Sequence, residues 1–330
     1  MPGKWCVLFG LCAAASCADV DASLDLQPLA LTEGVREPLP GRRARTILHQ
    51  KVNEAENLFF TEDGRLFVSG GEDIYEFERA ADGTFSKTDY FDEDCLVEGI
   101  VRSGNHLYGV CTLNDDADAK TFLIAGELSA QPKFRSIAPL PPASIPNGMT
   151  VDDEGRIYIT LSQTNRILRL TMASPLEVAR TEVWAENLSI VKLVEISKVG
   201  DTIKYVDHAL YVTTLELTLI SRFLRIPVRP DGSAGEPEEL YQRALTCLDD
   251  VIAFDGGFII TDFVNGTLIF WDEQRGAYAE TPRGTFYGPT SLAQGQPPLF
   301  DARQLIVAEK GLYLVRDEWN GDLLSRYQLP

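Results

Sequence analysis

The sequence predicts an all-β protein: a six-bladed β-propeller built from four-stranded antiparallel blades. A phrase recurs six times along the 330 residues, with a polar or acidic residue, a short apolar run, a turn centred on Gly or Asp, and a β-rich run ending near Thr or Ser. Successive copies begin about 41 to 54 residues apart, which is the period of a propeller blade. No helical periodicity of useful length appears between the copies.

Length and composition indicate one large domain. Six blades of about 45 residues occupy roughly 270 residues. We therefore assign residues 44–330 to the propeller, residues 18–43 to a linker without fixed structure, and residues 1–17 to a signal peptide. A hydrophobic content of 45% is ample for a core of this size.

The N-terminal segment predicts export. Lys4 precedes an apolar stretch, Trp5 to Ala15, that is too short to span a membrane as a helix. Cys17 follows small residues, as at a bacterial lipoprotein processing site. We expect a periplasmic or extracellular protein, either free or held at the outer membrane by a lipid on Cys17. No other contact with a membrane is expected.

The blades can be followed in order along the chain. Blade one contains AENLFFTEDGRLFVSGG, with turns at Asp63–Gly64 and Asp82–Gly83. Blade two contains VEGIVRSGNHLYGVC, and blade three contains the regular hairpin GMTVDDEGRIYIT. Blade four begins at Asp201, after an insertion or irregular lead-in, NLSIVKLVEISKVG. Blade five contains VIAFDGGFIITDF, and blade six contains GPTSLAQ and RQLIVAEK.

Blade six lacks its own outermost strand in the sequence. We expect residues 44–50, ARTILHQ, to supply that strand from the N-terminal side. Such an exchange would remove an exposed sheet edge and close the ring.

Charge and cysteine content restrict the partners. The net charge of −19 repels phosphate backbones, so we expect a small-molecule ligand or substrate and no nucleic acid. Cys95 and Cys111 flank the first strand of blade two. Either they form a disulfide or they remain buried thiols together with Cys247. No CxxC motif supports a zinc or redox site.

The first strand of each blade lines the central channel, and its first residue points into the channel mouth. These six lead residues are Glu56, Glu98, Asn147, Asp201, Asp249 and Thr290. Asp250 follows immediately after the fifth. Several acids buried together are costly unless they bind a cation or take up protons. An oxygen-only ligand set suits Ca²⁺ best, with another divalent cation as the alternative. The simpler interpretation of each residue is a polar group hydrogen-bonded to backbone at a blade entrance.

The motifs resemble a known family. PNGMTVDDEGRIYIT is similar to the third-blade motif, CLDDVIAFDGG to the fifth-blade motif and AENLFFTEDGRLFVS to the first-blade motif of the calcium-dependent senescence marker protein/gluconolactonase propellers. Paraoxonases and strictosidine synthase-like proteins are related to that group. The resemblance implies Glu56, Asn147 and Asp249 as calcium ligands. Asp201 stands where relatives usually carry Asn and is the fourth candidate ligand. Glu98 replaces the catalytic His of paraoxonases, so a His mechanism is not implied.

Two functions remain open from the sequence. The first is a calcium-dependent hydrolase of lactones or related esters, in which Glu98 or Asp250 accepts a proton from the attacking water. The second is a non-catalytic ligand-binding or scaffold propeller with a structural calcium ion. A strictosidine synthase-like condensation is a third possibility, but no residue in the sequence identifies an amine substrate.

Overall fold

The computed structural model describes residues 37–91, 95–113, 120–142, 144–162, 164–186, 198–216, 220–311 and 321–329. The expected signal peptide, the expected lipid attachment at Cys17 and the irregular lead-in to blade four at 187–197 lie outside these residues. Within the described part of the chain, no helix has the length and apolar character needed to cross a membrane.

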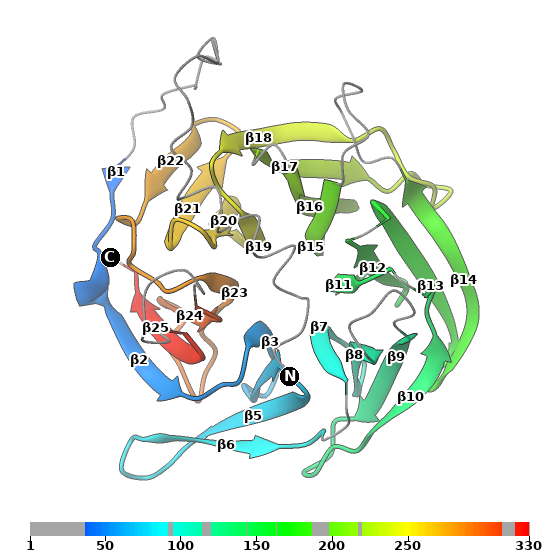
Figure 1. Ribbon diagram of the computed structural model, residues 1–330, viewed down its shortest axis with the longest axis horizontal. Helices are drawn as coiled ribbons and strands as arrows, with labels where there is room; N and C mark the ends of the chain where they lie inside the picture. The colour runs from blue at the N-terminus through cyan, green and yellow to red at the C-terminus, as the bar shows by residue number, and fades with distance from the viewer. Residues whose placement is uncertain are drawn as a thin grey trace.

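Six antiparallel sheets surround a central axis (Figure 1). The innermost strands are β3 (Ala55–Phe60), β7 (Leu96–Ser103), β11 (Pro146–Val151), β15 (Lys198–Val206), β19 (Leu248–Phe254) and β23 (Pro289–Gln294). The second strands are β4 (Leu66–Gly70), β8 (His106–Leu113), β12 (Ile157–Leu161), β16 (Ala209–Glu216), β20 (Gly257–Asp262) and β24 (Gln304–Glu309). The third strands are β5 (Asp73–Arg79), β9 (Lys120–Glu127), β13 (Arg166–Ser174), β17 (Ile220–Pro227), β21 (Thr267–Asp272) and β25 (Leu323–Gln328). The outermost strands are β6 (Phe85–Asp89), β10 (Phe134–Pro139), β14 (Glu177–Glu186), β18 (Glu238–Ala244), β22 (Gly276–Glu280) and, in blade six, β2 (Arg45–Gln50). The predicted six-bladed propeller is therefore confirmed.

Burial changes with distance from the axis. Every described residue of β4, β12 and β20 is buried, because a neighbouring blade covers each face of these second strands. The outermost strand β6 has no buried residue. The apolar core is divided into clusters that lie between adjacent blades, such as Ile306 and Leu324 of blade six against Leu58 and Tyr75 of blade one. Blade-to-blade packing thus fixes the positions of the inner strands around the axis.

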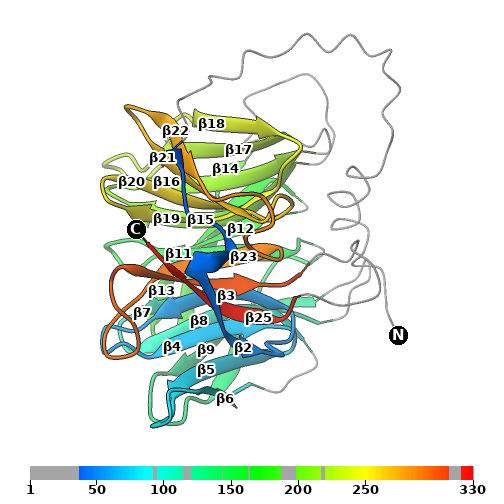
Figure 2. The same cartoon turned by 90° about the vertical axis from the view of Figure 1, so that its left-hand side faces the viewer.

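The N-terminal strand closes the ring as the sequence predicted. Strand β2 pairs antiparallel with β25, from Arg45 opposite Tyr327 to Gln50 opposite Leu323. The guanidinium of Arg45 forms two hydrogen bonds with the carboxylate of Glu309 on β24, at 2.8 and 2.7 Å. Figure 2 shows β2 running beside β25. Because Arg45 and Glu309 are both buried, this ion pair joins the start of the propeller to its end.

The last part of the expected linker has fixed structure, which corrects the sequence interpretation for residues 37–43. Strand β1 (Glu37–Pro38) adds in parallel to β22, giving blade five a fifth strand. A 3-10 helix, η1 (Arg42–Ala44), then leads into β2. The sequence did not reveal strand β1, because the segment is rich in proline and a two-residue strand has no periodicity of its own.

The open question about the cysteines is resolved in favour of the disulfide. Cys95 and Cys111 are bonded, with their Cα atoms 5.6 Å apart, across the β7–β8 hairpin. Cys247 is buried near the start of β19.

Candidate functional site

Every innermost strand has a register irregularity at its lead residue. The shifts lie between Ala55 and Asn57, Val97 and Ile100, Pro146 and Met149, Gly200 and Ile203, Leu248 and Val251, and Pro289 and Ser291. Each interval contains one of the six predicted lead residues. A bulge adds a residue, bends the strand and re-aims the side chain at that point. The lead residues are therefore structurally equivalent, as the repeat predicted.

Hydroxyl groups hold the bulged backbone in place. Thr160 of blade three donates to the carbonyl of Asp201 in blade four, and Thr213 of blade four donates to the carbonyl of Asp249 in blade five, each at 2.7 Å. Ser69 of blade one does the same for Glu98 of blade two. In these three blades, the Thr or Ser near the end of the sequence repeat thus orients the lead residue of the next blade.

Two glycines allow the inner strands to approach closely. A Cβ atom on Gly99 would lie 2.1 Å from the carbonyl oxygen of Asn147, and one on Gly148 would lie 2.7 Å from that of Asp201. Both distances are shorter than any side chain permits, so only glycine fits after these lead residues. The close approach brings Glu98, Asn147 and Asp201 to one side of the channel mouth.

The carboxyl groups at the mouth outnumber the cations. Glu56, Glu98 and Asp249 are buried, and Asp201 and Asn147 are half-buried. Lys310, at the end of the second strand of blade six, donates to Glu56 Oε2 at 2.6 Å. Burial disfavours the charged ammonium, but Glu56 and Glu98 outweigh burial and raise the pKa of Lys310. The Lys310–Glu56 ion pair is itself buried.

The remaining acids of the site favour their protonated forms. Burial, and then the charge of Glu56, raise the pKa of Glu98 to about 8. The same two causes raise the pKa of Asp201 to about 8, although Asn147 Nδ2 donates to Asp201 Oδ1 at 2.7 Å and opposes the shift. Burial and then the charge of Asp201 raise the pKa of Asp249 well above its ordinary value. These mutual effects place Glu56, Glu98, Asp201 and Asp249 in one electrostatic cluster.

Asp250 has a different environment from its neighbour Asp249. Its Oδ1 accepts from Thr202 Oγ1 at 2.8 Å and from Val251 N at 2.9 Å, and Lys204 Nζ lies 3.2 Å away. Its Oδ2 accepts from Ser291 Oγ at 2.6 Å and from Leu292 N at 3.2 Å. The side chain therefore links blade five to blades four and six, and both of its oxygens already have donors.

The arrangement of the acids and the chemistry of their donor atoms both concern a possible metal ion. No group of three or more His, Cys, Asp or Glu side chains in the described ranges is arranged to hold a metal ion. The cluster nevertheless offers only oxygen donors to a cation. Its four carboxyl groups could carry more negative charge than the single ammonium of Lys310 neutralises. Because Asn147 Nδ2 donates to Asp201, Asn147 Oδ1 is the amide atom available to a cation. The residue types fit a hard divalent cation.

Sequence reasoning missed both lysines of the site. Lys310 ends the sixth repeat, two positions after Ala308, which stands where blades one, three and four have the clamping Ser69, Thr160 and Thr213. Lys204 follows the lead of blade four by three positions. The departure at Ala308 was the available signal, although the partner of Lys310 is 254 residues away. Of the three histidines, His208 lies in an exposed turn beside Asp153, away from the lead positions.

Comparison with known proteins establishes the fold and no closer relationship. No protein-family description matches the sequence, and no curated protein matches it. The PQQ-bound aldose sugar dehydrogenase from Streptomyces coelicolor superposes with a TM-score of 0.58 at 14% identity, over 86% of this chain and 97% of that one. An auxiliary nutrient binding protein from Bacteroides ovatus gives 0.56 at 9% identity, over 89% and 75%. Virginiamycin B lyase from Staphylococcus aureus gives 0.51 at 12% identity, over 87% and 98%. The fold and site define a six-bladed propeller with an acidic axial cluster.

Proposed function

We propose that the protein is a hydrolase of lactones or related esters that depends on a divalent cation, Ca²⁺ in the first instance. The observation that carries the proposal is the surplus of acid at the channel mouth. Four carboxyl groups gather there around one paired ammonium, Lys310. Such a cluster is costly in a folded protein unless a cation offsets it or protons are retained. The motif resemblance to gluconolactonase-like propellers supports the same activity.

The proposed ligands are Glu56, Asn147, Asp201 and Asp249. Three of them supply carboxylate oxygens, and Asn147 supplies its amide oxygen. The bulges give these four residues equivalent positions on four blades, so each side chain approaches from a different side of the axis. Asp201 and Asn147 are half-buried, which leaves a small molecule access to the site.

Catalysis is assigned to Glu98. The ion, when bound, would polarise the substrate carbonyl and favour the ionised forms of the surrounding acids. Glu98 is buried beside Glu56, and in its ionised form it can accept the proton of the attacking water. Asp250, the second candidate base, has both oxygens engaged by hydrogen-bond donors. We therefore place Asp250 second to Glu98.

A non-catalytic binding propeller with a structural calcium ion is the second candidate. One observation favours it: Glu56, a required ligand, already forms a buried ion pair with Lys310. A propeller of similar shape is described as an auxiliary nutrient binding protein. Both functions imply a small-molecule partner.

Export remains part of the proposal. Disulfides persist in oxidising compartments, so the Cys95–Cys111 bond supports a periplasmic or extracellular location. Attachment to the outer membrane through a lipid on Cys17 is tested by fractionating cells that express the full chain and its Cys17→Ser variant. Retention of the variant in the membrane fraction would contradict the lipid anchor.

The central experiment measures bound metal and hydrolysis on the same samples. Purified protein is analysed for metal and assayed on a panel of lactones and aryl esters, with calcium and after chelation. The same measurements are then made on Glu98→Gln and Asp249→Ala. We expect Asp249→Ala to lose both metal and activity, and Glu98→Gln to keep metal and lose about 100-fold or more in kcat.

Three outcomes decide between the candidates. Calcium binding without turnover of any substrate supports the binding propeller. Turnover that survives chelation and both substitutions removes the proposed site altogether. Turnover that depends on calcium but not on Glu98 retains the hydrolase and transfers the role of base to another residue.

A further inference from the structure

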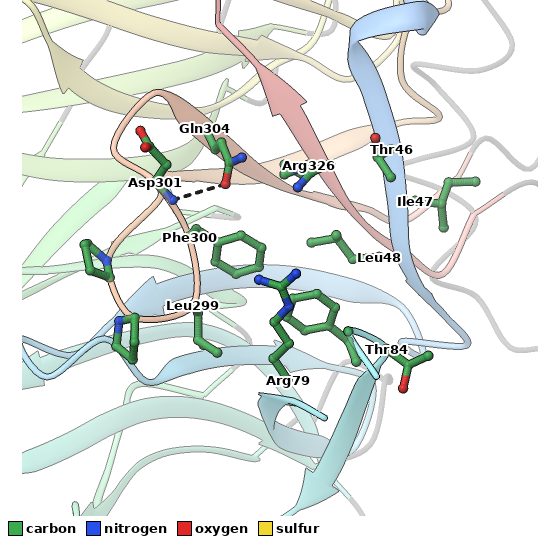
Figure 3. Close-up of a pocket in the computed structure, with 14 residues that line it drawn as sticks. Thr46, Ile47, Leu48, Arg79, Thr84, Leu299, Phe300, Asp301, Gln304 and Arg326 are labelled. Atoms are coloured by element: carbon green, nitrogen blue, oxygen red, sulfur yellow. Dashed lines mark hydrogen bonds between the residues drawn. The ribbon is translucent and has the colours of Figure 1, made fainter. Parts of the chain in front are cut away.

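A pocket of about 740 Å³ lies at the outer rim, where blade six meets blade one (Figure 3). Its walls come from four parts of the chain: strand β2, the β5–β6 hairpin, the loop between β23 and β24 with the start of β24, and strand β25. None of the six lead residues, Asp250 or Lys310 lines the pocket, so it is separate from the axial cluster. Its volume is in the range of pockets that hold small molecules.

The floor of the pocket is apolar and aromatic. Phe85 and Phe300 are stacked with ring centroids 5.3 Å apart and an interplanar angle of 2°. Leu48 of β2 and Leu299 of the loop complete this surface. Phe300 is also in edge contact with Phe60 of blade one, which fixes its ring from behind. The floor thus presents a flat surface suited to an alkyl chain or a ring.

The loop that forms one wall is held firmly. Gly64 of blade one lies against Pro297, where an added Cβ would come within 2.0 Å of the Pro297 carbonyl oxygen. Phe300 N donates to Gln296 O, and Gln304 N donates to Asp301 O. Asp301 N in turn donates to Gln304 Oε1 at 3.1 Å, as drawn in Figure 3. These contacts give the pocket a preformed shape.

Two arginines, Arg79 and Arg326, line the pocket. Neither Arg79 of β5 nor Arg326 of β25 forms an ion pair or a side-chain hydrogen bond with any residue in the described part of the chain. Figure 3 shows the Arg79 guanidinium beside Phe300, with Arg326 across the pocket from it and Leu48 nearby. The chain has a net charge of −19, but two arginines with no ion pair in the described part of the chain make this pocket locally positive.

The one carboxylate of the pocket lining does not neutralise them. Asp301 Oδ1 accepts a hydrogen bond from Arg303 N at 2.8 Å, which stabilises its own turn. Figure 3 shows the Asp301 carboxylate pointing away from Arg79 and Arg326. The two guanidinium groups are therefore available to an anionic ligand.

We propose that this pocket binds a small amphiphilic carboxylate, with the carboxylate between Arg79 and Arg326 and its apolar part on Phe85 and Phe300. Guanidinium groups recognise carboxylates through paired, charge-assisted hydrogen bonds. An alkyl chain or ring attached to the carboxylate would bury apolar surface on the aromatic floor and so bind more tightly than a bare anion. The site is independent of the axial cluster, so its test does not depend on the proposed hydrolase.

Binding has a consequence for ring closure. The ligand would touch β2, blade one and blade six together, which are the parts that separate when the ring opens. A ligand that binds only the closed ring raises its stability in proportion to occupancy. The melting temperature therefore gives a second readout beside binding itself.

The test uses three probes on the purified full chain: octanoate, 1-octanol without the charge, and acetate without the chain. Isothermal titration calorimetry is made on the wild type, Arg79→Gln, Arg326→Gln and the double variant, with Arg43→Gln as a matched exposed arginine outside the pocket. We expect octanoate to bind tightest and to raise the melting temperature. Each single variant should weaken octanoate binding about tenfold, and Arg43→Gln should not change it.

Several outcomes would overturn the proposal. They are equal affinity for octanoate and 1-octanol, unchanged octanoate binding in the double variant, or no heat and no thermal shift at millimolar octanoate. Acetate binding as tight as octanoate would remove the role of the aromatic floor. Arg79 is exposed and Arg326 is half-buried, so the variants are expected to fold, and their melting curves without ligand verify this.

Discussion

At the scale of single residues, the balance of charge at the channel mouth depends on Lys310. Its ammonium forms a buried ion pair with Glu56, the residue that the motif resemblance implies as a calcium ligand. An ammonium and a divalent cation that share one carboxylate compete for it. We therefore expect Lys310 to set how strongly the cluster would bind the proposed cation.

Substituting Lys310 by Met separates the effect of the ammonium on stability from its effect on calcium affinity. Without calcium, the variant should be less stable by about 3 kcal/mol, because Glu56 is left as a buried acid without its partner. With calcium, its affinity for the ion should rise at least tenfold, because Glu56 is released. Urea titration and calcium titration measure the two quantities, with the exposed Lys133→Met as control. Weaker calcium binding in Lys310→Met would show that the ammonium supports the site.

The residue scale also shows what sequence could and could not predict. The equivalent positions of the six lead residues could be predicted, because each blade repeats the same local pattern and each lead residue lies at the same bulge. Lys310 could not be assigned, because its function depends on a contact with a residue 254 positions away. The hydrogen bonds of Asp250 could not be predicted for the same reason, because Thr202 and Ser291 lie 48 and 41 residues away on two other blades.

At the scale of elements, Asp250 connects three inner strands. It lies on β19 and accepts hydrogen bonds from Thr202 on β15 and from Ser291 on β23. Backbone pairing stays within each blade, so contacts between adjacent inner strands come from side chains and close packing. A buried carboxylate with donors from both neighbours fixes the spacing of these strands.

Replacing Asp250 by Asn should therefore reduce stability. The amide keeps the shape but presents an N–H group to residues that are themselves donors, at an expected cost of about 3 kcal/mol. Asp255→Asn, in the exposed turn after β19, should change the free energy of unfolding by about 0.5 kcal/mol or less. Urea denaturation measures both. A variant as stable as wild type but inactive would instead assign Asp250 to catalysis.

The order of elements was predictable where it followed from local pattern. The turns follow from Gly-containing pairs such as Asp63–Gly64, and the exchange of residues 44–50 into blade six follows from the strand that blade six lacks in the sequence. Strand β1 was not predictable, because two residues carry no period and their pairing with β22 is decided by the tertiary structure. The rim pocket was hidden too, since β2, the β5–β6 hairpin and the β23–β24 loop meet only when the ring closes.

At the scale of the whole molecule, the axial acids link folding to pH. Burial and then the charge of Glu56 raise the pKa values of Glu98 and Asp201 to about 8. An ordinary carboxyl in the unfolded chain has a pKa near about 4. Between these limits the folded protein retains protons that the unfolded chain has released. The free energy of unfolding must therefore fall as pH rises from about 4 to about 8.

We expect this fall in the chelated protein to be about 1 kcal/mol per pH unit for each retained proton. Calcium should flatten the dependence, because a bound cation favours the ionised acids and releases their protons. Urea denaturation between pH 5 and 8 (about the range of the shift), with chelator and with calcium, measures both slopes. The double variant Glu98→Gln, Asp201→Asn lacks two of the titrating acids and keeps Asp249, so its slope without calcium should be clearly smaller than that of the wild type. If the wild type shows no slope in chelator, or the double variant keeps the full slope, the axial acids are not the electrostatic cluster on which the proposed cation site depends.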